Sequence, residues 1–227
     1  MNRIYISPAA CSPLREFLKE KGFELRFTEN DGSVVHDAIA QHPDIYMCQM
    51  GLFDDSRIFY GKKDSLSHTY PGDCIYNALC TGEYFIHNLK HTDRLLLETA
   101  RRAGLYLVNV KQGYARCSCL PVDDTSFITA DRGMAKALRS CGASVLLIRE
   151  GHVLLPGFKN GFIGGCGGCL VIDGKPCIVF NGDLCSHPDF EAMRLFICER
   201  GVRPVFFSGF PLTDIGSILT GRIISRT

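Results

Sequence analysis

The chain has 227 residues, of which 46% are hydrophobic and 22% charged, and its formal net charge is +1 at pH 7. Such a composition is typical of a globular protein and excludes extended disorder. The near-neutral charge argues against a nucleic-acid binder, which would be markedly basic. The sequence contains no apolar run of about 18 residues and no apolar leader, so we expect no membrane association and a cytosolic location.

Four segments share one order of elements: a short apolar strand, an amphipathic helix, a glycine and a second apolar strand. The strand pairs are 3–7 and 24–28, 84–88 and 105–110, 126–130 and 144–148, and 177–181 and 203–208. The helices are expected near 12–21, 91–103, 131–141 and 188–200, followed by Gly22, Gly104, Gly142 and Gly201. Glycine suits the left-handed conformation that ends a helix. Pro13 and Pro188 are expected at first helical positions.

A fifth, diverged unit is expected between Gly22 and Gly104, because their separation of 82 residues is about twice 41. Residues 43–80 contain the strand-like stretches 44–50 and 57–61 but no clear helix. Five units of roughly 40 residues are typical of a propeller. Two β-hairpins are also predicted, at 145–155 and at 169–180, the second around an Asp-Gly turn.

We therefore predict one α/β domain over residues 1–227, a closed five-bladed α/β propeller of strand–helix–strand units around a pseudo-five-fold axis. The strand-like tail at 221–227 would close the ring by pairing with the first unit. The alternative is an ordinary doubly wound α/β sheet, in which strands and helices also alternate.

Three stretches resemble motifs of the guanidino-group-modifying enzymes. Residues 125–131 (TSFITAD) are similar to the strand whose final aspartate contacts guanidinium in those enzymes. Residues 160–165 (NGFIGG) resemble the deiminase stretch Asn-Gly-His-x-Asp, which carries the catalytic histidine. Residues 214–220 (DIGSILT) resemble the C-terminal stretch with the nucleophilic cysteine, often Gly-x-His-Cys-x-Thr.

The whole chain, including residues 112–118 (QGYARCS), thus resembles the pentein fold family and an uncharacterised bacterial family of that fold. The family contains arginine and agmatine deiminases, dimethylarginine hydrolases and amidinotransferases. The resemblance implies an α/β propeller in which a thiolate attacks the guanidinium carbon while a histidine moves protons.

The positions of the essential groups differ from the family pattern. Phe162 stands at the histidine position, Gly164 at the paired acid and, aligned on Thr220, Ile218 at the nucleophile. We expect Phe162 and Ile218 near the axis. Either the site has moved within the fold or this chain does not perform the family's reaction.

Cys117 and His187 are the candidate catalytic residues. Cys117 follows a strand and is next to Arg116, whose charge could lower the thiol pKa. His187 would be the base, from a loop in which Asp183, Cys185 and His187 alternate. The alternatives are a structural cysteine and a helix cap. Arg116 also belongs to a basic group, with Arg101, Arg102 and Lys111, that we interpret as a solvated helix end.

A zinc site is a further possibility. Cys117 and Cys119 form a C-x-C, and Cys166 and Cys169 form a C-x-x-C, so four thiolates could meet. The alternative is that small residues pack a glycine-rich turn. We favour that alternative, and predict neither a metal nor a cofactor.

Four aspartates are the candidate ligand-binding residues, expected on loops that converge at the axis: Asp124, Asp131, Asp183 and Asp214. Converging carboxylates would favour a cationic guest such as a guanidinium, which is planar and permanently charged. Helix capping is the alternative for Asp131 and Asp183.

Three functions follow from these observations. The first is a degenerate pentein-like protein that binds a cationic guanidino or amidine small molecule without turnover. The second is a cysteine-dependent hydrolase or transferase of a guanidino compound, with a relocated thiol. The third is a protein- or RNA-interaction module, like the pentein-like translation initiation factor 6.

Overall fold

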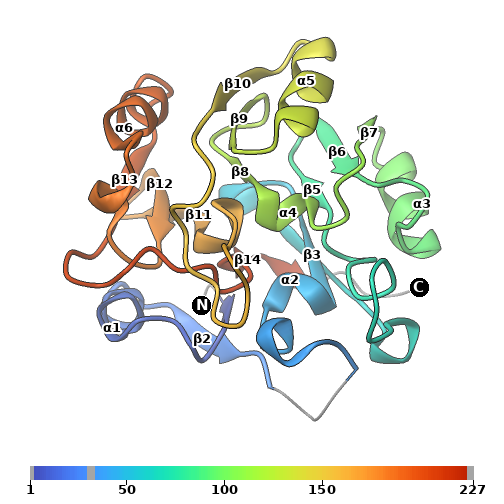
Figure 1. Ribbon diagram of the computed structural model, residues 1–227, viewed down its shortest axis with the longest axis horizontal. Helices are drawn as coiled ribbons and strands as arrows, with labels where there is room; N and C mark the ends of the chain where they lie inside the picture. The colour runs from blue at the N-terminus through green and yellow to red at the C-terminus, as the bar shows by residue number, and fades with distance from the viewer. Residues whose placement is uncertain (1–2, 30–33, 224–227) are drawn as a thin grey trace.

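The computed structural model describes residues 3–29 and 34–223. Within these residues the fold is mixed α/β, with five three-stranded sheets near the centre and helices around the outside (Figure 1). No described helix is long and apolar enough to cross a membrane.

All five sheets share one plan. An inner strand runs antiparallel to a middle strand, and the middle strand runs parallel to an outer strand. In that order the strands are β14 (Leu219–Thr220), β1 (Arg3–Ile6) and β2 (Glu24–Phe27); β3 (Met47–Met50), β4 (Arg57–Tyr60) and β15 (Arg222–Ile223); β5 (Leu79–Cys80), β6 (Tyr84–His87) and β7 (Tyr106–Asn109); β8 (Cys119–Pro121), β9 (Ser126–Thr129) and β10 (Ser144–Leu147); β11 (Gly167–Ile172), β12 (Lys175–Phe180) and β13 (Arg203–Val205).

Four longer helices connect the middle and outer strands of four sheets: α1 (Ser12–Glu20), α3 (Arg94–Arg102), α5 (Arg132–Ser140) and α6 (Phe190–Cys198). A glycine with a φ between +71° and +87° follows each helix, which confirms the predicted strand–helix–glycine–strand order. Pro13 lies in the first turn of α1 as expected. The expectation for Pro188 was wrong, because the Asp189 N–H donates to His187 Nδ1 and this turn delays the start of α6 until Phe190.

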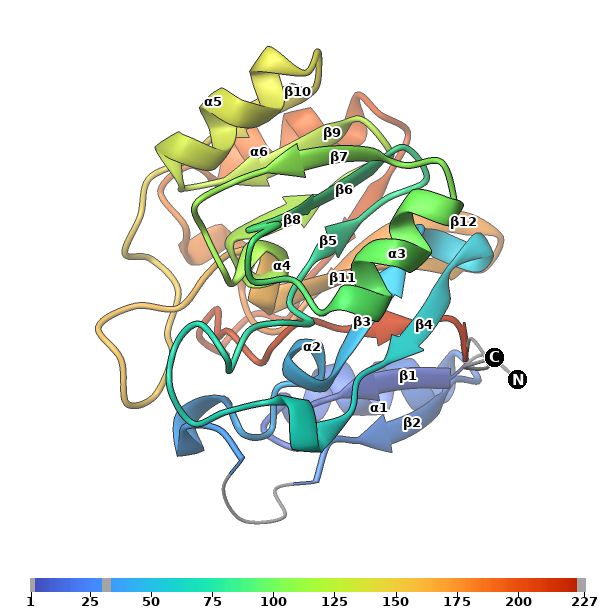
Figure 2. The same ribbon diagram turned by 90° about the vertical axis from the view of Figure 1, so that its right-hand side faces the viewer.

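The helices pack onto their sheets through apolar faces. Leu14 and Leu18 of α1, spaced by one helical turn, are fully buried against Ile4 and Ile6 of β1. Figure 2 shows from the side how α3 covers its own sheet, beside β6 and β7.

In the diverged second unit, the outer strand does not follow the middle strand through a single helix. Its outer strand is β15, which comes from the end of the chain and pairs with β4. The tail at 221–227 was expected to pair with the first unit. That expectation was wrong for its described residues: the strand that pairs with β1 is β14, just before the tail, and the chain then turns at Gly221 so that β15 pairs with β4 of the second unit. Residues 224–227 of the predicted tail lie outside the described residues.

One of the two predicted hairpins forms. β11 and β12 pair around Asp173 and Gly174, both with positive φ, as a two-residue turn requires. The hairpin predicted at 145–155 was wrong, because β10 pairs with β9 and the chain then enters a loop in which Leu154 bridges to Thr213.

Candidate functional site

Five chain segments, one ahead of each inner strand, meet at the centre of the fold. They include two short helices, α2 (Pro43–Tyr46) before β3 and α4 (Ala115–Ser118) before β8. Hydrogen bonds link the segments in a ring: Asp44 N to Gly216 O (3.3 Å), Asn77 Nδ2 to Asp44 O (3.4 Å), Arg116 N to Asn77 Oδ1 (3.0 Å), Arg116 Nη1 to Gly164 O (2.8 Å) and Ser217 N to Gly165 O (2.9 Å).

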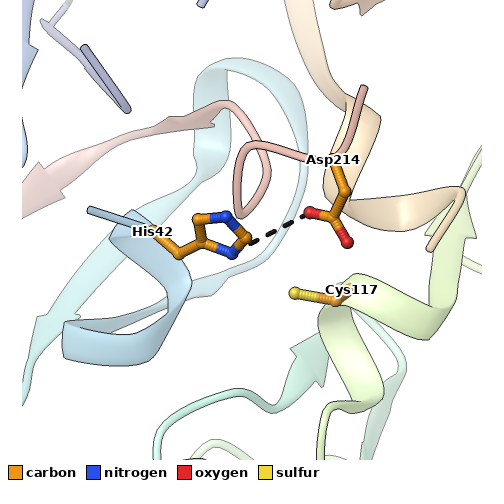
Figure 3. Close-up of side chains that lie close together, drawn as sticks. All are labelled: His42, Cys117 and Asp214. Atoms are coloured by element: carbon orange, nitrogen blue, oxygen red, sulfur yellow. Dashed lines mark ion pairs between the residues drawn. The ribbon is translucent and has the colours of Figure 1, made fainter. Parts of the chain in front are cut away.

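Three chemically different side chains point toward one another inside this ring (Figure 3). They are His42, Cys117 and Asp214, which come from distant parts of the sequence. One donor atom of each lies within 4.8 Å of the others. All three side chains are buried, and the His42 Nδ1 to Asp214 Oδ1 distance is 3.9 Å. We call these residues, together with Asp44, the central cluster.

Asp44 joins the cluster through its carboxylate. Its Oδ2 accepts hydrogen bonds from Cys117 Sγ (2.9 Å) and from Ser217 Oγ (2.7 Å). Asn77 Nδ2 lies 3.3 Å from the same sulfur. Asp44 Oδ1 is buried and has no hydrogen-bond partner among the described residues. A buried carboxylate oxygen without a partner is costly, so this atom marks a position where a donor or a cation is expected.

Asp214 is held by backbone donors. Its Oδ1 accepts from Gly216 N and its Oδ2 from Phe162 N, both at 2.9 Å. A methyl group at Gly165 would overlap this carboxylate, and one at Gly216 would overlap the His42 side chain. These glycines therefore allow the close approach on which the cluster depends.

Arg116 places a buried guanidinium beside the cluster. Nη1 and Nη2 donate to the carbonyl oxygens of Gly164 and Gly167, both at 2.8 Å. Its interpretation as part of a solvated basic helix end was wrong, because the ring of pre-strand segments encloses the side chain and supplies its acceptors.

Burial controls the protonation of the cluster. It raises the pKa of Cys117 well above the usual thiol value, and the charges of Asp44 and Asp214 add to this rise. Burial also raises the pKa of Asp44, and that of Asp214 to about 6, and it lowers the pKa of His42. In the absence of a ligand the site thus favours a thiol and a neutral imidazole.

Residues 5–219 match the model of a family described as a family of unknown function (DUF6873). The chain belongs to this family. The matched region includes every residue of the central cluster. No curated protein shows significant similarity to the sequence.

In this DUF6873 chain the four predicted ligand-binding aspartates do not converge. Asp131 accepts from Met134 N and caps α5, and Asp183 accepts from Cys185 N, which confirms the capping alternative for both. Asp124 lies in the β8–β9 turn, at the other end of the sheet from Cys119, and accepts from Gly82 N. Only Asp214 belongs to the cluster.

The two predicted catalytic residues, Cys117 and His187, lie in different places. Cys117 lies in the cluster, where its nearest histidine is His42. His187 packs against His152, with ring centroids 5.2 Å apart, and its Nδ1 accepts from Asp189 N. Its other polar contact is with the backbone of Arg149, and the structure does not join it to the thiol.

A surface cavity of about 1090 Å³ lies next to the cluster. His187 and Asp131 line it, as do Ser118, which follows Cys117, and Phe162, whose N–H holds Asp214. Ser118 Oγ is buried and unpaired within the described part of the chain. The cavity thus reaches two neighbours of the cluster, although none of the four cluster residues lines it.

The other sequence candidates have structural roles. Ile218 is buried in the core between β1 and β11, whereas its neighbour Ser217 faces Asp44. Cys119, Cys166 and Cys169 are buried, the last two with their thiols directed at the carbonyl oxygens of Phe162 and Pro121. Among the described residues, the one group with metal-ligand spacing contains Cys117 but none of these three cysteines.

Sequence reasoning missed four polar residues of the centre: His42, Asp44, Asn77 and Ser217. A signal for them exists. Asn77, Cys117 and Ser217 each stand two residues before an inner strand, and Asp44 stands three before β3. A polar residue recurring near that position in four of the five units, with Gly165 at the place before β11, indicates side chains that meet at the centre of the fold.

Proposed function

We propose that the five sheets are the blades of one α/β propeller of the pentein type. The identical strand order of the sheets supports this arrangement, as does the ring of hydrogen bonds between the segments that precede the inner strands. In such a propeller the central cluster lies on the pseudo-five-fold axis. Cys117 before β8 and Ser217 before β14 then occupy related places in two blades.

We further propose that the chain is a cysteine-dependent enzyme, a hydrolase or amidinotransferase acting in the cytosol on a small guanidino or amidine compound. The observation that carries this proposal is the meeting of one thiol, one imidazole and two carboxylates in the buried centre. The thiol is relocated: Cys117 replaces the cysteine that the C-terminal motif lacks.

Each group has a chemical role. Asp44 and Asp214 bind the cationic amidine by charge-assisted hydrogen bonds. His42 takes the proton of Cys117, and the sulfur attacks the central carbon of the guanidinium. The C–N bond breaks, and the leaving amine takes that proton from His42. In a hydrolase, water then attacks the carbon and the C–S bond breaks. One water proton passes to His42 and the other to the sulfur, which releases the urea-type product and the Cys117 thiol. In a transferase, a second amine attacks in place of water.

The substrate itself would activate the nucleophile. Burial and two carboxylates favour the thiol form of Cys117. A guanidinium bound between Asp44 and Asp214 neutralises their charge and lies beside the sulfur, which lowers the thiol pKa. The site thus favours a thiolate only when a cationic substrate is present.

The test is turnover of a panel of guanidino and amidine compounds, including arginine, agmatine and methylated arginines, with ammonia, amine and ureido products measured. We expect activity that Cys117→Ser abolishes and that Cys185→Ser, at an exposed thiol, leaves unchanged. Activity that survives Cys117→Ser contradicts the proposal. Stabilisation by these compounds with no product, equal in the wild type and Cys117→Ser, supports binding without turnover instead.

A further inference from the structure

The central cluster combines three kinds of metal donor. His42 offers an imidazole nitrogen, Cys117 a sulfur and Asp214 a carboxylate oxygen, and all three lie within 4.8 Å of one another (Figure 3). Nitrogen, sulfur and carboxylate ligands together are typical of zinc sites. Calcium and magnesium prefer sites made of oxygen alone, so this donor set favours a softer divalent ion.

The three donor atoms, which lie within 4.8 Å of one another, must move closer together to bind one ion. Tetrahedral zinc, with bonds of about 2.0 to 2.3 Å, keeps its ligand atoms roughly 3.3 to 3.8 Å apart. His42 Nδ1 and Asp214 Oδ1 are 3.9 Å apart. The backbone N–H groups of Gly216 and Phe162 already orient the Asp214 carboxylate, as second-shell donors do in metal sites.

Asp44 lies next to these three donors but outside the group that meets the 4.8 Å spacing. Its Oδ1 is buried without a hydrogen-bond partner in the described chain, and its Oδ2 accepts the thiol hydrogen of Cys117. A cation replacing that hydrogen would take the thiolate as a ligand and bring the unpaired carboxylate oxygen within reach. This unpaired oxygen, at which a donor or a cation is expected, is an observation separate from the spacing of the other three donors.

We propose that His42, Cys117, Asp214 and Asp44 bind one zinc-type divalent cation. On binding, the Cys117 S–H bond breaks, its proton passes to solvent and a sulfur–metal bond forms. The charges of the two carboxylates and the thiolate are then balanced by the divalent ion and the nearby Arg116 guanidinium. This proposal does not rest on the enzymatic one. If the reaction occurs, the ion blocks it by occupying the same donors.

Cobalt and zinc titrations of the chelator-treated full chain test this site. We expect one Co²⁺ per chain, with the charge-transfer absorption of a cobalt–thiolate bond and the intense visible bands of tetrahedral geometry. Calorimetry should give one Zn²⁺ per chain. Cys117→Ser should remove the charge-transfer band and weaken zinc binding at least about a hundredfold, because even second-shell changes cost 10- to 100-fold.

The control is the double variant Cys185→Ser and Cys198→Ser, which removes the two exposed thiols and should bind as the wild type does. Asp44→Asn keeps the shape of the side chain and should weaken zinc binding about tenfold. This variant replaces Cys117→Ser in the test if Cys117→Ser does not fold. The absence of a thiolate band, or a band lost in the double variant but kept in Cys117→Ser, overturns the proposal. Zinc binding that depends on Cys117 supports the metal site even if no turnover of guanidino compounds is found.

Discussion

Two sets of loops in this fold carry polar residues, and they use them differently. The loops that leave the middle strands for the helices use theirs to complete the local backbone, as Asp131 and Asp183 do when they accept from N–H groups two or three residues ahead. The segments that enter the inner strands also use the local backbone, since Asp214 accepts from Gly216 N, but they bring Cys117 close to both Asp44 and Asp214 and leave Asp44 Oδ1 unpaired. The outer-loop aspartates thus contact only nearby backbone, whereas the central groups also contact one another across distant segments, which is where chemistry is expected.

The largest effect on stability is expected at Arg116. Arg116→Ala leaves the buried carbonyls of Gly164 and Gly167 unpaired and removes the cation near the buried Asp214 carboxylate, which should cost about 2 to 5 kcal/mol of unfolding free energy. Urea denaturation measures the loss. Arg149→Ala is the control. The Arg149 side chain is largely exposed where it pairs with Asp189, so the free energy of unfolding should hardly change. Equal losses in both variants would contradict the contrast between the two regions.

The pH dependence of stability tests His87, a buried residue at the end of a middle strand. His87 ends β6, and burial lowers its pKa to about 4 from the ordinary 6.5. The unfolded chain therefore binds the proton first as the pH falls, so this residue should remove stability between about pH 6.5 and 4, by roughly 3 kcal/mol in total. His87→Gln should lose that part of the pH dependence when urea midpoints are compared at pH 7, 5.5 and 4. Identical slopes in both proteins would show that His87 is not held neutral.

A smaller effect is expected at the cap of α5. Asp131→Ala removes the acceptor of Met134 N and should cost about 1 kcal/mol. The same change should leave ligand and metal binding intact, whereas Asp44→Asn should weaken both. Thermal denaturation with and without Zn²⁺ measures the two properties together. A loss of zinc stabilisation in Asp131→Ala would place the site in the outer loops.

The sequence predicted the repeated units well because their signals are local. Amphipathic spacing marks α1, and a glycine after each long helix marks its end, so four units could be recognised from the sequence. The second unit was harder, since its outer strand β15 comes from the far end of the chain. No local pattern reveals such a pairing.

The site was predicted only in part. Cys117 and Asp214 stood out as a reactive residue type and as part of a resembling motif, respectively. His42 and Asp44 lie in a His-Pro-Asp segment of the diverged unit. They could be recognised as site residues only once the segments before the inner strands were seen to meet. Asp131 and Asp183 were misleading as ligands because capping and binding both favour aspartate at the end of a strand.

The central claim is that the buried cluster, and not the outer loops, recognises a cationic amidine beside a reactive thiol. A matched pair of alkylating agents tests it most directly: chloroacetamidine, which is cationic, and chloroacetamide, which is neutral. In both, the thiolate displaces chloride. Peptide mapping by mass spectrometry should find Cys117 labelled preferentially by the amidine, with the preference lost in Asp44→Asn and kept in Asp131→Ala. Labelling confined to the exposed Cys185 and Cys198, at similar rates with both agents, would contradict the claim.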